Sequence, residues 1–274
     1  MTPADPPVAV PTVSGPVTGG KGQPALLTTT LDLSTVGYRA EEYFLAGTAT
    51  AFAPAGMLPA DICWAVRPSS TAAYTTRLVV YRPSDLANFN GTVVVEWLDA
   101  SGGVDVPADW IKVHIELIRN GFAWVGVSAQ AVGVEGPIVG TNASGPIGGS
   151  KAIDPARYAS RDHPGDSYSY DIFSQAGLAV RHRNGPDPLA GLQTRRVIAV
   201  GCPQSADRIA THVNSMQPLA HIFDGFLVHS RSLAAGNLSD GPQPVAVPNP
   251  WFLLAADAKN LESAATHSAI GIAR

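Results

Sequence analysis

Val197-Ile198-Ala199-Val200-Gly201 is followed directly by Cys202-Pro203-Gln204-Ser205-Ala206, so a run of β-branched and small apolar residues enters a tight turn. Such a run, bounded by turn residues, is typical of a strand buried in a parallel sheet. A helix is predicted directly after it, from Ala206 to Met216. Strand, turn and helix in this order indicate an α/β architecture.

Similar units lie on both sides of this stretch. Apolar runs predict strands at 92–98, 122–128, 225–230 and 251–256, and helical spacing predicts helices at 110–118 and 170–183. Before them, segments 25–33, 43–52 and 77–81 mix β-branched and aromatic residues with turn residues, as an antiparallel hairpin or meander does. We therefore predict a mostly parallel central sheet with helices on both faces and an N-terminal antiparallel extension.

Two segments of the chain are rich in glycine and proline. Residues 1–24 predict a flexible or wrapping N-terminal arm, which leaves residues 25–274 as a single, C-terminally short domain. Residues 132–166 have little periodicity and are long for a connection, so we expect a lid or rim loop over a site there.

Composition excludes several classes of protein. The 274 residues are 45% hydrophobic and 15% charged with a net charge of −4, which argues against a disordered chain and against a nucleic-acid partner. We expect no membrane partner and a cytoplasmic location, because no secretory signal or long apolar run is seen. Cys63 and Cys202 lie far apart, no metal-ligand spacing such as H-E-x-x-H occurs, and we predict neither a metal nor a cofactor.

The turn at 201–205 has the outline of a nucleophile elbow. In a G-x-S-x-G turn, the central serine is held up on a strained backbone at the end of the sheet. Here Pro203 occupies the central place. Proline has neither hydroxyl nor thiol, and its ring fixes φ near about −65°, which opposes the strained conformation.

Several motifs between Pro11 and Leu233 resemble the bacterial α/β-hydrolase domain proteins of the esterase-like kind. The resemblance rests on Gly47-Thr48-Ala49, Asn90 to Leu98, Gly126 to Gln130, Asp154 to Tyr158, His163 to Asp166, Asp171 to Gln175 and Phe223 to Ser230. The family's elbow is similar to Gly-Glu-Ser-Gln-Ser, which Gly201, Gln204 and Ser205 match and Cys202 and Pro203 do not. The resemblance implies an α/β-hydrolase fold, carboxylic-ester hydrolysis through a serine, and a chain shortened at its C-terminus.

Four residues are candidates for the missing chemistry. Cys202 is a thiol one residue before the apex, where strand alternation predicts that it points elsewhere, so a buried structural thiol is the simpler interpretation. Ser205 falls in the first helical turn, where serine commonly caps or packs. Asp257 and His267 follow the last predicted strand in the chain order of a triad acid and histidine, but their interval is too short for the usual intervening helix and strand.

Other residues are candidates for a pocket. Backbone N–H groups near Leu98, Asp99 and Gln204 occupy the places from which an oxyanion would be bound. His229 ends a strand at the edge of the sheet where ligands collect in α/β folds. His163 and Asp166 are predicted to shape a turn.

We therefore predict a protein related to carboxylic-ester hydrolases, with a small-molecule ester or acid ligand and impaired or absent activity. Three alternatives stay open: a non-catalytic small-ligand binding or interaction protein on the same fold, a poorly folding remnant with an incomplete sheet, and an enzyme that uses other groups. The sequence favours no particular oligomeric state.

Overall fold

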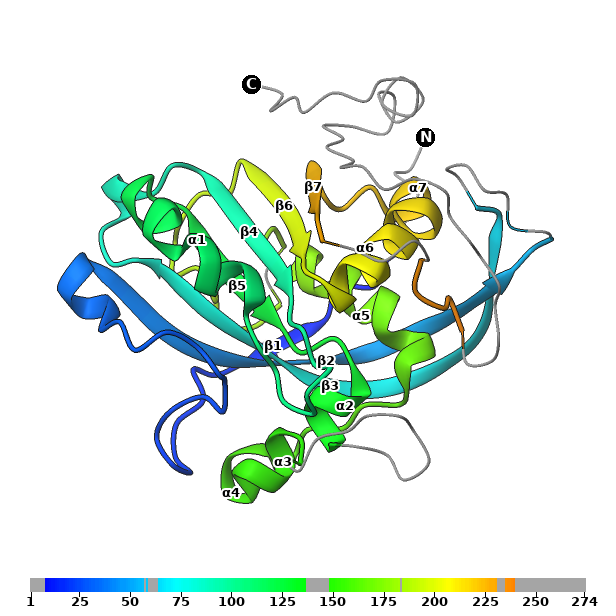
Figure 1. The fold of residues 1–274 in the computed structure, drawn as a ribbon, viewed down its shortest axis with the longest axis horizontal. Helices are drawn as coiled ribbons and strands as arrows, with labels where there is room; N and C mark the ends of the chain where they lie inside the picture. The colour runs from blue at the N-terminus through cyan, green and yellow to red at the C-terminus, as the bar shows by residue number, and fades with distance from the viewer. Residues whose placement is uncertain are drawn as a thin grey trace.

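The computed structural model describes residues 8–56, 58, 64–136, 148–182, 184–230 and 235–239. Within them, one mixed sheet has the strand order β1-β2-β3-β5-β4-β6-β7 (Figure 1). The strands are β1 Thr12–Ser14, β2 Tyr38–Pro54, β3 Val66–Pro83, β4 Thr92–Trp97, β5 Ala123–Val127, β6 Arg196–Gly201 and β7 Gly225–Val228. β1, β2 and β3 pair antiparallel, whereas β5, β4, β6 and β7 run parallel to one another.

Seven α-helices connect or cover the described strands. They are α1 Ala108–Arg119, α2 Ala131–Glu135, α3 Ser150–Ile153, α4 Pro155–Tyr158, α5 Ser169–Ala179, α6 Gln204–Ser215 and α7 Gln217–Ala220. Short 3-10 turns, labelled η1, η2 and η3, lie at Leu33–Val36, Leu86–Asn88 and Asp166–Tyr168.

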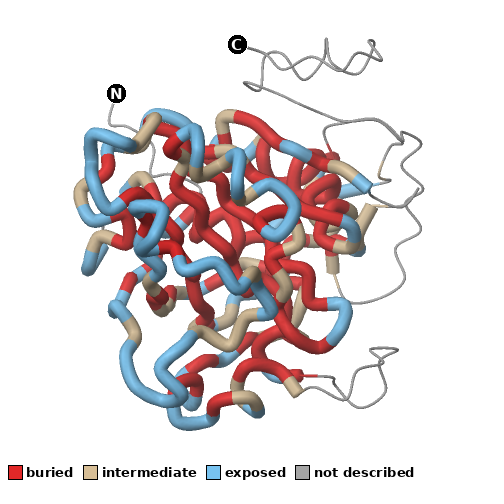
Figure 2. Tube along the Cα trace, turned by 60° about the vertical axis from the view of Figure 1, so that its left-hand side comes forward, coloured by how far each residue is buried: buried red, intermediate tan, exposed pale blue. Residues whose placement is uncertain are grey.

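Strand alternation separates two apolar cores. Along β4, Val93, Val95 and Trp97 belong to a core with residues of α5 and α6, while Val94 belongs to a core with residues of α1. Successive side chains point to opposite faces of a sheet, so the helices cover both faces. Buried residues accordingly fill the middle of the molecule (Figure 2).

The outer edge of β2 is occupied along much of its length. β1 pairs with residues 44–46 of β2. On one side of this pairing, the Val17 N–H donates to the Glu42 carbonyl at 2.7 Å. On the other side, α5 supplies two side chains: Gln175 Nε2 donates to the Thr48 carbonyl at 2.8 Å, and the Thr50 N–H donates to Asp171 Oδ2 at 2.7 Å.

Most predicted elements are confirmed, with one clear exception. The α/β architecture, the antiparallel hairpin and the strand–turn–helix at 196–215 form as expected. The segment Ala25–Leu33 is not a strand, and that prediction was wrong. The backbone of Ala25 instead binds side chains, because its N–H donates to Tyr158 Oη at 2.8 Å and its carbonyl accepts from Arg77 Nη2 at 2.7 Å. The strand predicted at 251–256 lies outside the described residues.

The predicted arm and lid are partly described. In the arm, Val8 and Val13 are buried and β1 joins the sheet, so residues 12–14 take the wrapping form and not the flexible one. In the segment 132–166, α3 and α4 form, and Arg157 and Tyr158 are buried against β2. Residues 137–147 lie outside the described part, and the division into an arm, one domain and a lid stays a prediction.

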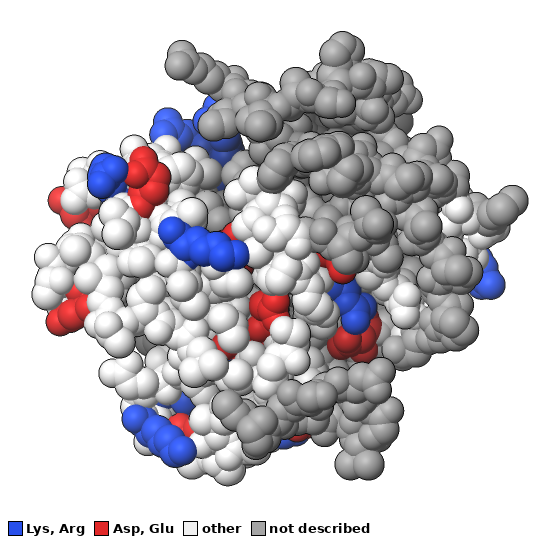
Figure 3. Space-filling model, in the orientation of Figure 1, with Lys and Arg blue, Asp and Glu red and all other residues white. Residues whose placement is uncertain are grey.

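The charged side chains are dispersed on the face shown in Figure 3. Lys and Arg side chains are separated there by uncharged residues and by Asp and Glu, and the described residues form no continuous basic patch on that face. In the part of the chain that the structure describes, no helix is long and apolar enough to cross a lipid bilayer.

Candidate functional site at the carboxyl ends of the parallel strands

The turn from β6 into α6 carries Cys202 and Pro203 at the carboxyl end of the sheet. Pro203 has φ −79° and ψ −40°, which is ordinary right-handed helical backbone, and it forms the N-cap of α6. The strained, positive-φ conformation that aims a nucleophile is therefore not adopted at this turn. Proline explains this, since its ring excludes positive φ.

Ser205 closes the same turn. Its side chain is buried, and its Oγ accepts from the Cys202 N–H at 2.9 Å and donates to the Cys202 carbonyl at 3.2 Å. Both contacts lie within the turn, so the hydroxyl holds the backbone, and within the described part of the chain no histidine or carboxylate is bonded to it. A serine without a paired base is a weak nucleophile.

Cys202 points away from the turn toward α1. Ile198 and Val200 pack in the α1 core, and alternation along β6 places Cys202 on the same face. Its side chain is buried, and its Sγ lies 2.7 Å from Lys112 Nζ of α1. This contact raises the pKa of Lys112.

His229 meets the first turn of α1. It follows β7 directly, and its Nε2 makes a short hydrogen bond to Asp109 Oδ1, while its Nδ1 lies 3.2 Å from Ser230 Oγ. Asp109 is buried and His229 is partly buried. The donor atoms of Asp109, Cys202 and His229 all lie within 4.8 Å of one another.

Glu96 fixes the start of α1. Its carboxylate accepts from the N–H groups of Asp109 at 2.8 Å and Trp110 at 2.9 Å, and from Trp124 Nε1 at 2.8 Å. Pro107, the N-cap of α1, supplies no side-chain cap, so this buried carboxylate satisfies N–H groups of the first turn. Burial, and secondarily the nearby Asp109, raise the pKa of Glu96, whereas the three N–H donors oppose the rise.

The predicted oxyanion donors near Leu98 are engaged elsewhere. The Leu98 N–H donates to the Val127 carbonyl at 3.2 Å, and the Asp99 N–H donates to the Val106 carbonyl at 3.0 Å. Neither group is free for a ligand in this conformation, because the backbone of β4 continues its pairing past Trp97.

Gln204 is placed differently: it begins α6, where the first N–H groups have no acceptor within the helix. Its Oε1 is buried without a hydrogen-bond partner among the described residues.

The remaining predicted residues fall into two groups. His163 Nε2 lies 2.9 Å from the Ala129 carbonyl, and its Nδ1 accepts from the Gly165 N–H at 3.2 Å, so it holds a turn. Asp166 accepts from the Ala131 N–H at 2.9 Å and pairs with Arg208 at 2.8 Å. Asp257 and His267 lie outside the described residues, and a triad through them stays a prediction.

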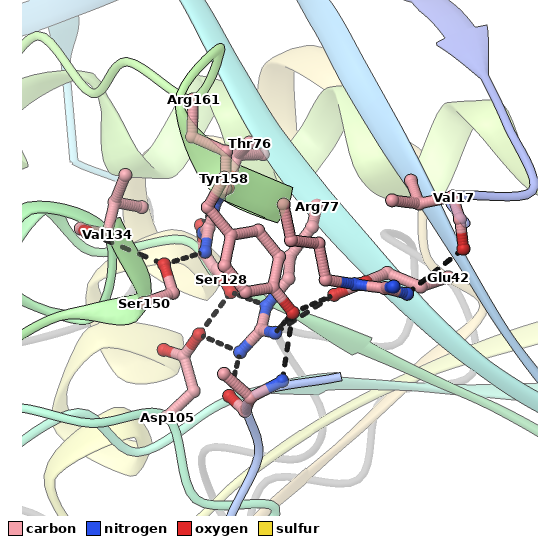
Figure 4. A network of polar contacts seen from close by, with 12 residues as sticks. Val17, Glu42, Thr76, Arg77, Asp105, Ser128, Val134, Ser150, Tyr158 and Arg161 are labelled. Carbon is pink, nitrogen blue, oxygen red and sulfur yellow. Dashed lines mark hydrogen bonds and ion pairs between the residues drawn. The ribbon is translucent and has the colours of Figure 1, made fainter. Parts of the chain in front are cut away.

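A buried network of charges lies beside this end of the sheet, centred on Arg77 of β3 (Figure 4). Arg77 pairs with Glu42 at 2.9 Å and with Asp105 at 2.8 Å, and its Nε donates to Ser128 Oγ at 2.9 Å. Arg161 is fully buried nearby, and burial together with Arg77 lowers its pKa to about 9. The roles of Glu96, Asp109 and this network cannot be recognised from the sequence alone, because their partners come from other segments of the chain.

The profile of the alpha/beta hydrolase domain family matches residues 13–264. The chain therefore belongs to the α/β-hydrolase domain family, which agrees with the fold and with the resemblance of its motifs.

Solved structures with a similar chain path include two esterases. A glucuronoyl esterase from Solibacter usitatus has 11% identity and a TM-score of 0.39, with 87% of this chain and 55% of that chain covered. Acetyl xylan esterase 1 from a Thermoanaerobacterium species has 11% identity and a TM-score of 0.34, with 67% of this chain and 53% of that chain covered. The chain thus spans about half the length of either esterase. A search of the curated proteins found no match.

Proposed function

We propose that this α/β-hydrolase is related to carboxylic-ester hydrolases and that its serine acyl-transfer activity is impaired or absent. The observation that carries the proposal is Pro203, which stands between β6 and α6 in helical backbone. The ester class itself rests on the family and on the motifs that resemble esterase-like members.

Ser205 does not replace the missing nucleophile. Its Oγ is bonded to the backbone of Cys202 in both directions. Removal of the serine from a catalytic triad costs on the order of 10⁶ in turnover, while binding and oxyanion groups leave a small residual rate. We therefore expect near-inactivity toward esters.

The test is hydrolysis of short-chain aryl esters by the wild type and by three variants at equal folded concentration. The variants are Pro203→Ser, Pro203→Ala as its matched control, and Ser205→Ala. We expect the wild type, Pro203→Ala and Ser205→Ala to be equally close to the uncatalysed rate. Turnover by Pro203→Ser alone would indicate a site that lacks only its nucleophile. Robust wild-type turnover that Ser205→Ala abolishes would overturn the proposal.

A second candidate function is binding of a small ester or acid without turnover. The first turn of α6 favours it, because Gln204 contributes a backbone N–H group at the positive end of a 12-residue helix, where an anionic or carbonyl oxygen is stabilised. Calorimetric titration with short-chain carboxylates tests this function. Binding that Gln204→Pro weakens without any ester turnover would support it, because proline removes this N–H group and is tolerated at the first position of a helix. Absence of binding would contradict it.

The remaining predictions about partners and location are independent of this site. That the protein has no nucleic-acid partner and acts in the cytoplasm rests on the sequence alone.

A further inference from the structure

Three chemically different donor groups meet on the α1 face of the sheet. Asp109 belongs to the first turn of α1, Cys202 follows β6, and His229 follows β7. A carboxylate oxygen, a thiol sulfur and an imidazole nitrogen lie there within 4.8 Å of one another. We propose that Asp109, Cys202 and His229 bind a divalent transition-metal cation of the zinc type.

The donor set matches the chemistry of such an ion. Zn²⁺ takes thiolate, imidazole and carboxylate ligands in a tetrahedral arrangement, and three protein ligands leave a fourth position for water or an anion. Hard cations such as Mg²⁺ prefer oxygen ligands alone, so sulfur and nitrogen together favour a softer ion.

Asp109 provides an independent indication. It is 5% exposed, and its Oδ2 is buried without a hydrogen-bond partner among the described residues. A buried carboxylate oxygen without a partner costs free energy, which a bound cation would offset. Its other oxygen, Oδ1, already contacts His229.

The framework around the donors is rigid. Glu96 holds the backbone N–H groups of Asp109 and Trp110, and Cys202 is bonded through its own N–H to Ser205. Cys202 directly follows β6 and His229 directly follows the neighbouring strand β7, so their side chains reach the same space. Tetrahedral ligands at about 2.0–2.3 Å from zinc lie roughly 3.3–3.8 Å apart. The three donors, which lie within 4.8 Å of one another, therefore need only side-chain rotations to reach one ion.

Lys112 competes for the sulfur. Its ammonium lies 2.7 Å from Cys202 Sγ, in the space beside the other two donors. The Lys112 residue is exposed, so its head group can turn into solvent when an ion binds. Removal of this lysine should therefore strengthen metal binding.

The test is titration of the full chain, freed of metal, with Co²⁺ alone as a spectroscopic substitute for zinc. We expect a thiolate-to-cobalt charge-transfer absorption with one equivalent of Co²⁺, which added Zn²⁺ displaces. Cys202→Ser should abolish this absorption. Asp109→Asn and His229→Ala should weaken binding by about tenfold or more, since even residues that only support metal ligands commonly account for such factors. Lys112→Ala should bind more tightly than the wild type.

Two matched variants serve as controls. Cys63→Ser removes the other cysteine of the chain, and His182→Ala removes an exposed histidine, and both should bind Co²⁺ like the wild type. Thermal unfolding provides a second readout, because Zn²⁺ should raise the Tm of the wild type and not that of Cys202→Ser. Absence of the charge-transfer band in the wild type, or its survival in Cys202→Ser, would overturn the proposal. Neither result depends on ester turnover.

Discussion

His212 is a buried histidine inside an aromatic cluster. Its ring packs edge-on against Phe173, at a centroid distance of 5.6 Å, and against Phe223, at 5.4 Å. Its Nε2 lies 2.8 Å from Ser174 Oγ, and its Nδ1 has no partner among the described residues. Burial lowers the pKa of His212 from 6.5 to about 3, so the folded protein keeps this imidazole neutral.

The stability of the protein should therefore depend on the charge state of His212. Between pH 6.5 and about 3 the unfolded chain binds a proton here that the folded chain does not, so the free energy of unfolding falls as the pH is lowered through this window. One such group contributes a slope of about 1 kcal/mol per pH unit, and its contribution is complete above pH 6.5. Urea unfolding of the wild type and of His212→Gln at pH 4.5, 5.5, 6.5 and 7.5, roughly spanning this range, measures it.

We expect the difference in unfolding free energy between these two proteins to shrink as the pH falls. The exposed His182→Gln variant is the control and should follow the wild type at every pH. Parallel profiles for the wild type and His212→Gln would contradict the assignment.

Helix α1 depends on a residue from another element. Glu96 of β4 accepts from the first-turn N–H groups of α1 and from Trp124 of β5, so one carboxylate joins two strands and a helix. Glu96→Gln replaces one acceptor oxygen with an NH₂ group that faces an N–H donor. We expect a loss of about 1–3 kcal/mol in the free energy of unfolding, because one buried N–H donor is left without an acceptor.

Glu116→Gln on the same helix is the matched control. Glu116 is exposed and pairs with Arg119 and Asn120 at the surface, so its change should cost less than about 0.5 kcal/mol. Equal costs for the two variants in denaturant unfolding would show that Glu96 does not hold the helix.

The helices and strands were largely predictable from the sequence, whereas the side-chain contacts between different elements were not. β4 and β6 are apolar runs bounded by turn residues, and Pro203 is visible in the sequence as a departure from the elbow pattern. The strand predicted at Ala25–Leu33 does not form. Its β propensity could not reveal that the backbone of Ala25 is hydrogen-bonded to the side chains of Arg77 and Tyr158. The Asp109–His229 contact joins residues 120 positions apart, so no local pattern in the sequence predicts it.

The Arg77 network connects several segments that are distant in the sequence. Arg77, Arg157 and Arg161 surround the Tyr158 ring at 5.2, 5.9 and 5.4 Å from its centroid. Glu42 balances this charge, because it accepts from Arg77 Nη1 at 2.9 Å, Arg157 Nε at 2.5 Å and Tyr158 Oη at 2.9 Å. Arg157 in turn donates to the carbonyls of Val17 and Gly19. The arm, the hairpin and α4 thus share one buried carboxylate.

Neutralising that carboxylate should loosen the whole assembly. We expect Glu42→Gln to lower the free energy of unfolding by about 3–5 kcal/mol, because it removes the carboxylate charge that pairs with buried Arg157 and one of the two that pair with buried Arg77. Glu135→Gln, which breaks a half-exposed pair with Lys151, should cost less than about 1 kcal/mol. Urea unfolding of both variants measures the difference, and a small cost for Glu42→Gln would indicate that the network contributes little to stability.

The occupied edge of β2 bears on how copies of this protein behave toward one another. A free edge strand offers its backbone groups to any other extended chain and so invites aggregation or exchange of strands between molecules. Here residues 42, 44–46, 48 and 50 already have partners from the arm, β1 and α5, and Pro11 and Pro16, which lack an N–H group, flank the short outer strand. The N-terminal segment and α5 thus cover the edge of β2, so its backbone groups are not available to pair with a strand of another molecule.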